Sequence, residues 1–217
     1  MANFETRRTM MVDTQVRPSD VTKFPIIDAM LTVPREAFVP TSLREAAYVG
    51  ENLTLPGGRT MLDPRTLAKM LDALDVSPSD VLLDVGCGLG YSTAVAAHLA
   101  EFVVGLEDDA ERAAEAQGNL SDAGIDNAAV MTGPLNEGVA KSGPYDVVVI
   151  HGGVEVVPDA LTAQLRDGGR IAALFVQGAL GTVRIGLKVD GRVNWRDAFN
   201  AGAPVIEGFR RMAAFAL

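Results

Sequence analysis

The 217-residue chain has very little cysteine, and it has no long hydrophobic run. Its single cysteine, Cys87, excludes an internal disulfide and a metal cluster built on cysteines, and we expect no metal site. No stretch of 18 uncharged apolar residues is present, and residues 1–11 lack the apolar core of a signal peptide. These absences predict a cytoplasmic protein that does not span a membrane.

Basic residues are also few. The net charge is −9, and no block of lysines or arginines is present. Proteins that bind nucleic acid tightly use such blocks to neutralise phosphates, so we expect no nucleic-acid partner. Hydrophobic residues make up 48% of the chain, which is enough for a sizeable core. The length fits one α/β domain with an added segment.

The chain does contain a glycine-rich turn after a short apolar run. Residues 81–84 read as a strand, and glycines follow at alternate positions, Gly86, Gly88 and Gly90. Glycine permits sharp turns and close approach of a ligand, and the helix start expected next offers free amide donors. Glu107 ends the next apolar run, where doubly wound folds place the acid that binds a ribose. The pattern indicates a site for a nucleoside cofactor.

The spacing of these glycines favours S-adenosyl-L-methionine over a dinucleotide. The third glycine of the dinucleotide fingerprint allows a helix to pack closely on a strand, but Tyr91 stands at that position here. Asp84 precedes the turn, where a carboxylate suits a cationic group better than a pyrophosphate. S-adenosyl-L-methionine carries an ammonium, a sulfonium and a ribose diol, and no phosphate. We therefore assign Asp84 and the glycines to its methionine moiety, and Glu107 with Asp108 to its ribose.

The alternation of apolar and helical stretches from Val81 onward predicts a Rossmann-like, doubly wound α/β fold. We expect a mostly parallel seven-stranded sheet with antiparallel C-terminal strands and an N-terminal helical segment. Strands are expected at 81–84, 102–106, 128–131, 145–150, 170–176, 182–189 and 192–199, and residues 209–215 read as a strand that closes the sheet. The helices between strands are expected at 91–100, 109–123 and 158–165.

The region before the sheet is predicted to be helical. Helices are expected at 5–16, 21–32 and 65–74, with Asp20 as the cap of the second. We divide the chain into residues 1–56, a helical segment that covers the substrate cleft, and residues 57–217, the S-adenosyl-L-methionine-binding domain.

Residues 33–40, Val-Pro-Arg-Glu-Ala-Phe-Val-Pro, resemble the V-P-R-E-x-F-V-P segment of protein-L-isoaspartate O-methyltransferases. Residues 144–146, Pro158 and residues 165–170 are similar to later motifs of that family, and the glycine turn is similar to motif I of class I methyltransferases. The resemblance covers the chain from about residue 33 to the final strand. It implies a monomeric enzyme that methylates the α-carboxyl of isoaspartyl residues in damaged proteins and so promotes their repair.

Two segments depart from the family pattern. The family's substrate loop, G-Q-T-I-S-Q-P, reads Gly-Arg-Thr-Met-Leu-Asp-Pro at 58–64, so Leu62 replaces a serine hydroxyl. A hydrogen bond to a carboxylate is worth roughly 1.5–3 kcal/mol, and its loss in the transition state slows a reaction about 10- to 150-fold. The family's G-D-G turn reads Gly133-Pro134-Leu135, which removes an acid expected near the adenine unless Asn136 or Glu137 replaces it.

The expected chemistry needs alignment of the reactants rather than a general base, because a carboxylate acceptor is already ionised at neutral pH. Thr60 can donate a hydrogen bond to this carboxylate, and Arg59 can pair with it. His151, expected after a strand with space beside it at Gly152-Gly153, is the candidate base for a hydroxyl or amine acceptor. The candidate cofactor-binding residues are Asp84, Gly86, Cys87, Gly88, Gly90, Tyr91, Glu107, Asp108 and Leu135.

Isoaspartyl methyl transfer is the leading interpretation, and two alternatives stay open. The first is a methyltransferase of the same fold with a different acceptor, which Leu62 and the segment 151–153 suggest. The second is a protein that binds S-adenosyl-L-methionine without catalysis, since the glycine turn is intact beside an altered substrate loop. A nicotinamide-dependent dehydrogenase is disfavoured by Tyr91.

Overall fold

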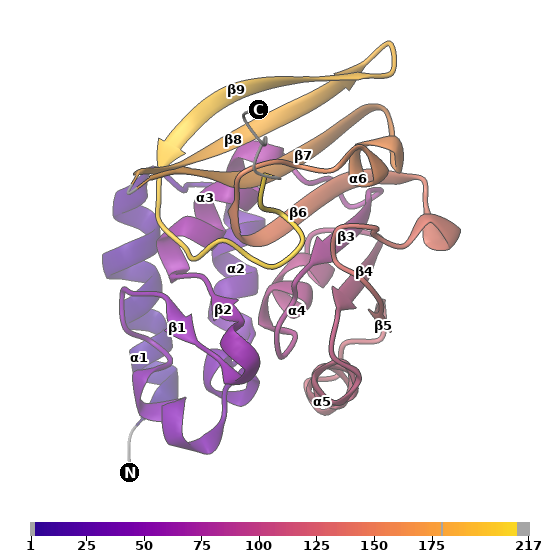
Figure 1. Cartoon of the computed structure of the whole chain (residues 1–217). Helices are drawn as coiled ribbons and strands as arrows, with labels where there is room; N and C mark the ends of the chain where they lie inside the picture. The colour runs from indigo at the N-terminus through magenta and orange to yellow at the C-terminus, as the bar shows by residue number, and fades with distance from the viewer. Residues whose placement is uncertain (1–2, 179, 212–217) are drawn as a thin grey trace.

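The computed structural model describes residues 3–178 and 180–211, and it contains one seven-stranded sheet (Figure 1). In spatial order the strands are β5 (Ala128–Thr132), β4 (Phe102–Glu107), β3 (Val81–Val85), β6 (Tyr145–Val154), β7 (Leu165–Gln177), β8 (Leu180–Val189) and β9 (Arg192–Asn200). Neighbours from β5 to β7 are parallel, whereas β8 and β9 are added antiparallel. The predicted fold class is confirmed.

Side chains of the central strands alternate between two hydrophobic clusters, one on each face of the sheet. Leu82 and Val103 belong to the first cluster, whereas their neighbours Leu83 and Val104 belong to the second. The alternation follows from the two-residue period of a strand. Parallel strands covered on both faces read as nearly continuous apolar runs, which explains the buried run 147–150.

Helices cover the two faces unequally. The first cluster includes residues of α1 (Phe4–Met11), α2 (Phe24–Thr32), α3 (Pro64–Leu74), α4 (Tyr91–Ala97) and α5 (Ala110–Asp122). The second cluster is covered by α6 (Asp159–Ala163) and by irregular segments that include Leu135 and Ile206. In Figure 1, α1, α2 and α3 lie together on the left, below the long hairpin of β8 and β9.

The helical segment differs from the prediction at its helix ends. The helix expected at 5–16 is α-helical only to Met11 and continues as a π-helical turn to Val16. Asp20 does not cap α2, so that prediction is wrong. It has a left-handed backbone (φ 65°) after the 3₁₀ turn Arg17–Ser19, whereas α2 begins after Lys23 with a proline in its first turn.

A small hairpin and an extension of one strand, both near the carboxyl edge of the sheet, were not predicted. Strands β1 (Leu53–Thr54) and β2 (Thr60–Met61) form a small antiparallel hairpin around the 3₁₀ turn Pro56–Gly58, so the expected division at residue 56 falls inside it. Strand β6 continues past Ile150 to Val154, with an irregular register to β7 between Val149 and Gly153. Such bulges often re-aim side chains beside functional sites.

The last predicted strand, 209–215, lies largely outside the described residues. Within the described part, residues 201–208 contain no strand of the sheet, and the chain instead packs across β6. Gly153 forms an isolated bridge with Val205, and Phe209 is buried in the second cluster. This segment therefore covers the end of β6 rather than adding a strand up to residue 211.

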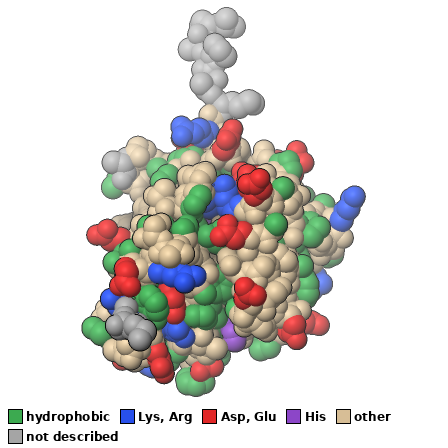
Figure 2. All heavy atoms as spheres, turned by 90° about the horizontal axis from the view of Figure 1, so that it is seen from below, with side chains coloured by type: hydrophobic (Ala, Val, Ile, Leu, Met, Phe, Trp, Pro, Cys, Tyr) green, Lys and Arg blue, Asp and Glu red, His purple; other side chains and the backbone are tan. Residues whose placement is uncertain are grey.

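The molecular surface shows no gathering of one charge on the face drawn in Figure 2. Acidic side chains are spread over this face, and lysines and arginines lie between them. In the part of the chain that the structure describes, no helix has the length and apolar character needed to cross a membrane.

Candidate active site

The glycine turn joins β3 to α4 beside the point where the strand order reverses, because β4 and β6 lie on opposite sides of β3. Open α/β sheets bind ligands at this point. Gly86, Gly88 and Gly90 all have positive φ angles, of 75°, 61° and 97°. A Cβ atom on Gly86 would stand 3.2 Å from the carbonyl oxygen of His151, and one on Gly90 would stand 3.2 Å from that of Ala116. The turn therefore needs glycine for both its backbone and its space.

Asp84, expected near the cationic part of the cofactor, has its carboxylate engaged inside the protein. The side chain is 1% exposed, and Oδ2 accepts hydrogen bonds from the hydroxyls of Ser92 (2.8 Å) and Thr93 (2.6 Å) in α4. Among the described residues no donor in good hydrogen-bond geometry reaches Oδ1, which instead lies 2.5 Å from Nε2 of His151. Burial alone would raise the pKa of Asp84, but the neighbouring His151 and the two hydroxyls outweigh it and lower that pKa.

His151 lies within β6 rather than after a strand, at the irregular register with β7. The space expected beside it is filled, so that prediction is wrong. A Cβ on Gly152 would stand 2.5 Å from Cγ2 of Ile206, and one on Gly153 would stand 2.7 Å from the carbonyl oxygen of Ala203. The two glycines allow the segment after β9 to pack closely behind His151, and the imidazole faces the cavity described below.

Glu107, the expected ribose ligand, is fully buried at the end of β4 and is the centre of a charged cluster. Its Oε1 accepts hydrogen bonds from the Gly88 amide (2.7 Å) and from Nε of Arg59 (2.9 Å). Its Oε2 accepts from Nη2 of Arg59 (3.2 Å) and from Nη1 of Arg112 (2.8 Å). Two arginines thus converge on one carboxylate at the glycine turn.

Asp108 completes this cluster, with a side chain that is 40% exposed. Its Oδ1 accepts from Arg59 (2.7 Å) and from Arg112 (3.2 Å). Burial opposes ionisation of Asp108, but the hydrogen bond and charge of Arg59 outweigh it and lower the pKa of this carboxyl. Arg59 was expected to face the substrate carboxylate. In this structure its guanidinium is instead bound to Glu107 and Asp108.

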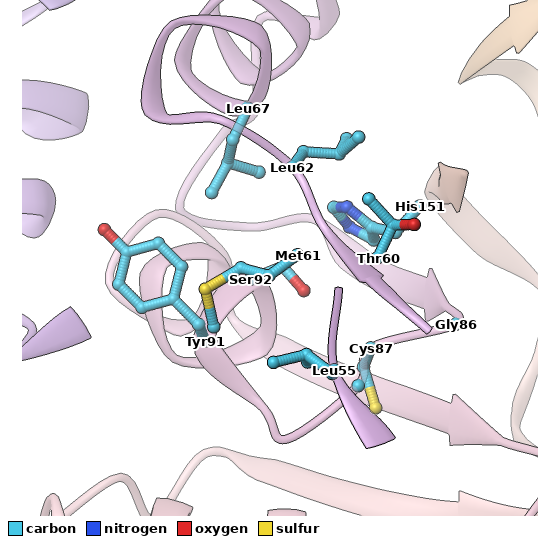
Figure 3. Close-up of a pocket in the computed structure, with 11 residues that line it drawn as sticks. Leu55, Thr60, Met61, Leu62, Leu67, Gly86, Cys87, Tyr91, Ser92 and His151 are labelled. Atoms are coloured by element: carbon cyan, nitrogen blue, oxygen red, sulfur yellow. The ribbon is translucent and has the colours of Figure 1, made fainter. Parts of the chain in front are cut away.

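A small cavity, with a volume of about 10 Å³, lies against the glycine turn (Figure 3). Its wall includes Thr60 of β2, Leu62 and Leu67, together with Gly86 and His151. Among the described residues no group hydrogen-bonds to the Thr60 hydroxyl, although the residue is buried. Leu62 is buried in the first hydrophobic cluster, so the position of the family's serine carries an apolar wall.

The remaining residues that were predicted to bind the cofactor pack in different ways at the glycine turn. Cys87 is buried, and its Sγ would lie 3.2 Å from a Cβ on Gly105 in β4, so it packs against the sheet. Burial raises the pKa of its thiol well above the ordinary value. Leu135 packs beside Gly86, where its Cδ1 would lie 3.7 Å from a Cβ. Asn136 contacts Gly208, and Glu137 is exposed.

Tyr91 lines the cavity only in part, because its ring packs away from the turn. It lies edge-on to Phe38, with 6.0 Å between ring centroids, and under the guanidinium of Arg35 at 4.6 Å. Arg35 is fully buried and donates to the carbonyl oxygens of Ala47 (2.7 Å) and Leu62 (2.8 Å). It therefore joins the helical segment, the cavity wall and the start of α4.

Sequence reasoning missed the roles of Arg35 and Arg112. Arg35 belongs to the Val-Pro-Arg-Glu segment, whose sequence indicated a family but no contact partner. Arg112 lies in the first turn of α5. Arg112 is five residues after Glu107 in the sequence, which is near enough for contact. The contact forms because the chain turns between β4 and α5 and brings the guanidinium to that carboxylate.

The residues at the turn suit an adenosyl sulfonium. Glycine lets a ligand approach the backbone closely, and Glu107 supplies two carboxylate oxygens of the kind that accept hydrogen bonds from a ribose diol. In residues 3–178 and 180–211 no cluster of three histidine, cysteine or acidic side chains forms a possible metal site. A glycine turn and a buried acid at the switch point of a doubly wound sheet define the class I methyltransferase fold.

A model of the protein-L-isoaspartate(D-aspartate) O-methyltransferase (PCMT) family matches residues 7–181. The chain is 38% identical over 171 residues to the protein-L-isoaspartate O-methyltransferase of Koribacter versatilis, covering 79% of this chain and 77% of that protein. It is 35% identical over 191 residues to protein-L-isoaspartate O-methyltransferase 2 of Pelobacter propionicus, covering 86% and 85%. The chain belongs to the protein-L-isoaspartate O-methyltransferase family, a family of S-adenosyl-L-methionine-dependent enzymes, which confirms the predicted membership.

Solved structures agree with this fold. One protein-L-isoaspartate O-methyltransferase matches with a TM-score of 0.80 and 23% identity, over 94% of this chain and 66% of that chain. A Plasmodium falciparum protein described as an enzyme of this kind, solved with S-adenosyl-L-homocysteine, matches with a TM-score of 0.79 and 18% identity over 95% and 99%. These likenesses confirm the architecture of the sheet and its helices.

Proposed function

We propose that the protein transfers the methyl group of S-adenosyl-L-methionine to the carboxylate of isoaspartyl residues in proteins or peptides. The proposal rests on three features that lie together at one end of the sheet. They are the glycine turn, the buried Glu107 and the cavity lined by Thr60. Membership of the family supports the choice of acceptor. The cofactor supplies an electrophilic methyl group, and an ionised carboxylate acceptor needs no base.

The roles of the chain's residues follow from their positions. We propose that Gly86, Gly88 and Gly90 hold the cofactor close to the backbone, and that Glu107 with Asp108 binds its ribose. Leu135 lies where it can pack beside the turn. Thr60 is buried and lines the cavity, and we propose that its hydroxyl donates to the acceptor carboxylate. Apolar Leu55, Met61 and Leu62 line the cavity and exclude water from it.

Two further assignments belong to this proposal. We propose that residues 1–56, together with the β1–β2 hairpin, form the wall that covers the substrate cleft. Leu55 directly follows β1, Thr60 belongs to β2, and both residues line the cavity. We also propose that the enzyme acts in the cytoplasm as a monomer.

A labelling assay tests the proposal. With radiolabelled S-adenosyl-L-methionine, we expect base-labile label on an isoaspartyl peptide and none on the matched peptide with a normal aspartyl residue. Binding of S-adenosyl-L-homocysteine without transfer to either peptide would contradict the proposed acceptor. Absence of binding at millimolar concentration would contradict the proposed cofactor site as well.

A second candidate, transfer to a hydroxyl or amine, is favoured by one observation. His151 faces the cavity and lies 2.5 Å from the Asp84 carboxylate, so a buried acid orients an imidazole beside the acceptor site. A base is needed only for an acceptor that must lose a proton. Label that is stable to base, together with loss of transfer in His151→Asn, would support this second function against the first.

Thr60→Val is expected to lower kcat/KM for the isoaspartyl peptide by about 10- to 150-fold, because the hydrogen bond from its hydroxyl to a carboxylate is worth roughly 1.5–3 kcal/mol. The affinity for S-adenosyl-L-homocysteine should not change, since the hydroxyl faces the acceptor. Steady-state kinetics and calorimetry measure the two effects.

The matched control is Thr54→Val, because Thr54 pairs with Thr60 across the hairpin but is exposed. Its kcat/KM should stay within twofold of the wild-type value, or about 0.4 kcal/mol. Equal losses in the two variants would show that the hairpin, rather than the Thr60 hydroxyl, is being disturbed.

A further inference from the structure

Arg59 occupies the glycine turn itself. The residue precedes β2, and its side chain crosses the turn: its Cδ lies 3.8 Å from where a Cβ of Gly86 would stand, and its Cγ lies 3.6 Å from the corresponding point on Gly88. The side chain is only 7% exposed. The family's loop G-Q-T-I-S-Q-P has a glutamine where this chain has Arg59.

The guanidinium of Arg59 also takes the hydrogen-bonding positions that a ribose would need. Its Nε and Nη2 bind the two oxygens of Glu107 as a fork, at 2.9 and 3.2 Å. The Gly88 amide and Arg112 complete the environment of this carboxylate. A ribose diol that binds Glu107 must therefore replace a charged, two-point contact, which is among the stronger kinds of hydrogen bond.

The shape of the cavity agrees with this arrangement. Its wall includes Gly86, Gly88, Thr60 and His151, but neither Glu107 nor Asp108 contributes to it. The open space therefore does not reach Glu107, whose two carboxylate oxygens are bound by the Arg59 guanidinium. Its volume of about 10 Å³ is room for about one water molecule, far below the roughly 300–1,000 Å³ of sites that hold small molecules.

We infer that Arg59 is an affinity-determining residue that competes with the cofactor for Glu107, so that the adenosyl site opens only when this arginine leaves. The inference rests on the proposed function, since it assumes that Glu107 binds the ribose. The backbone before Arg59 suits such a movement, because Gly57 and Gly58 both have positive φ angles and a Cβ on Gly58 would have no neighbour within 4 Å.

The inference predicts the sign of an affinity change. When only the open state binds a ligand, the apparent Kd is the intrinsic Kd divided by the open fraction. Arg59→Gln removes the competing charge and restores the residue of the family's loop. We expect it to bind S-adenosyl-L-homocysteine about tenfold more tightly than the wild-type protein, which corresponds to an open fraction of about one tenth in the wild type. Isothermal titration calorimetry on the full chain measures this Kd.

Arg112→Gln is the matched control. Arg112 binds the same two carboxylates, but its guanidinium lies beside Gly57 rather than across Gly86 and Gly88. The substitution removes the same charge without opening the turn, so the affinity should not rise. Arg59→Lys keeps the charge but cannot form the fork, and we expect an affinity between those of wild type and Arg59→Gln.

The outcomes separate the inference from the proposed function. Tighter binding in Arg59→Gln but not in Arg112→Gln supports the inference, and binding tighter than wild type in Arg59→Lys supports it even if the glutamine variant does not fold. Equal affinity in wild type and both Arg59 variants would overturn the inference and leave the proposed function intact. An equal gain in Arg112→Gln would also overturn it, because the effect would then come from charge alone. If no variant binds the ligand at millimolar concentration, the proposed function fails.

Discussion

Glu107→Ala is expected to weaken binding of S-adenosyl-L-homocysteine by about 10- to 150-fold, because a ribose hydrogen bond to a carboxylate is worth roughly 1.5–3 kcal/mol. The same substitution should lower the free energy of unfolding by about 3 kcal/mol or more, since it leaves Arg59 and Arg112 without their shared buried partner. Calorimetry and urea unfolding measure the two effects.

The control for this prediction is Asp108→Ala. Asp108 contacts the same two arginines, but its side chain is 40% exposed, and exposed ion pairs contribute about 1 kcal/mol or less. We expect the loss of stability to be much smaller than in Glu107→Ala. Unchanged ligand affinity in Glu107→Ala would show that the ribose is held elsewhere. An equal loss of stability in the two variants would contradict the inference that Glu107 is the main partner of Arg59 and Arg112.

Arg35→Lys is expected to lower the free energy of unfolding by about 2–4 kcal/mol, because a lysine keeps the buried charge but cannot reach two carbonyls and stack on an aromatic ring. Arg35 is fully buried, and among the described residues no carboxylate forms an ion pair with it. Burial lowers the pKa of its guanidinium, while the neighbouring Tyr91 opposes that effect. The buried Arg35 guanidinium is therefore stabilised by the carbonyl oxygens of Ala47 and Leu62 and by the Tyr91 ring.

The matched substitution is Arg44→Lys, in the 3₁₀ segment Thr41–Ala46, where the side chain is exposed. We expect its unfolding free energy to stay within about 0.5 kcal/mol of wild type. Chemical denaturation followed by far-UV circular dichroism gives both values. If the two variants unfold alike, Arg35 does not hold the helical segment to the cavity wall as the contacts indicate.

The sequence predicted some parts of this structure and not others. The strands and the glycine turn follow from local patterns: apolar runs gave the positions of β3 and β4, and the turn required glycine at Gly86, Gly88 and Gly90. Errors arose where distant segments meet. The glycines after His151 read as open space, yet the segment at 203–206 packs against them.

The sequence by itself determined the sheet, the position of the glycine turn and the acid at the end of β4, because strand periodicity and backbone conformation are properties of neighbouring residues. Only the tertiary structure decided which partners these groups meet. Arg59 and Glu107 are 48 residues apart in the chain, and Asp84 meets an imidazole from another strand. The first contact depends on how the hairpin of β1 and β2 reaches the glycine turn, and the second depends on the pairing of β3 with β6. No local pattern encodes either arrangement.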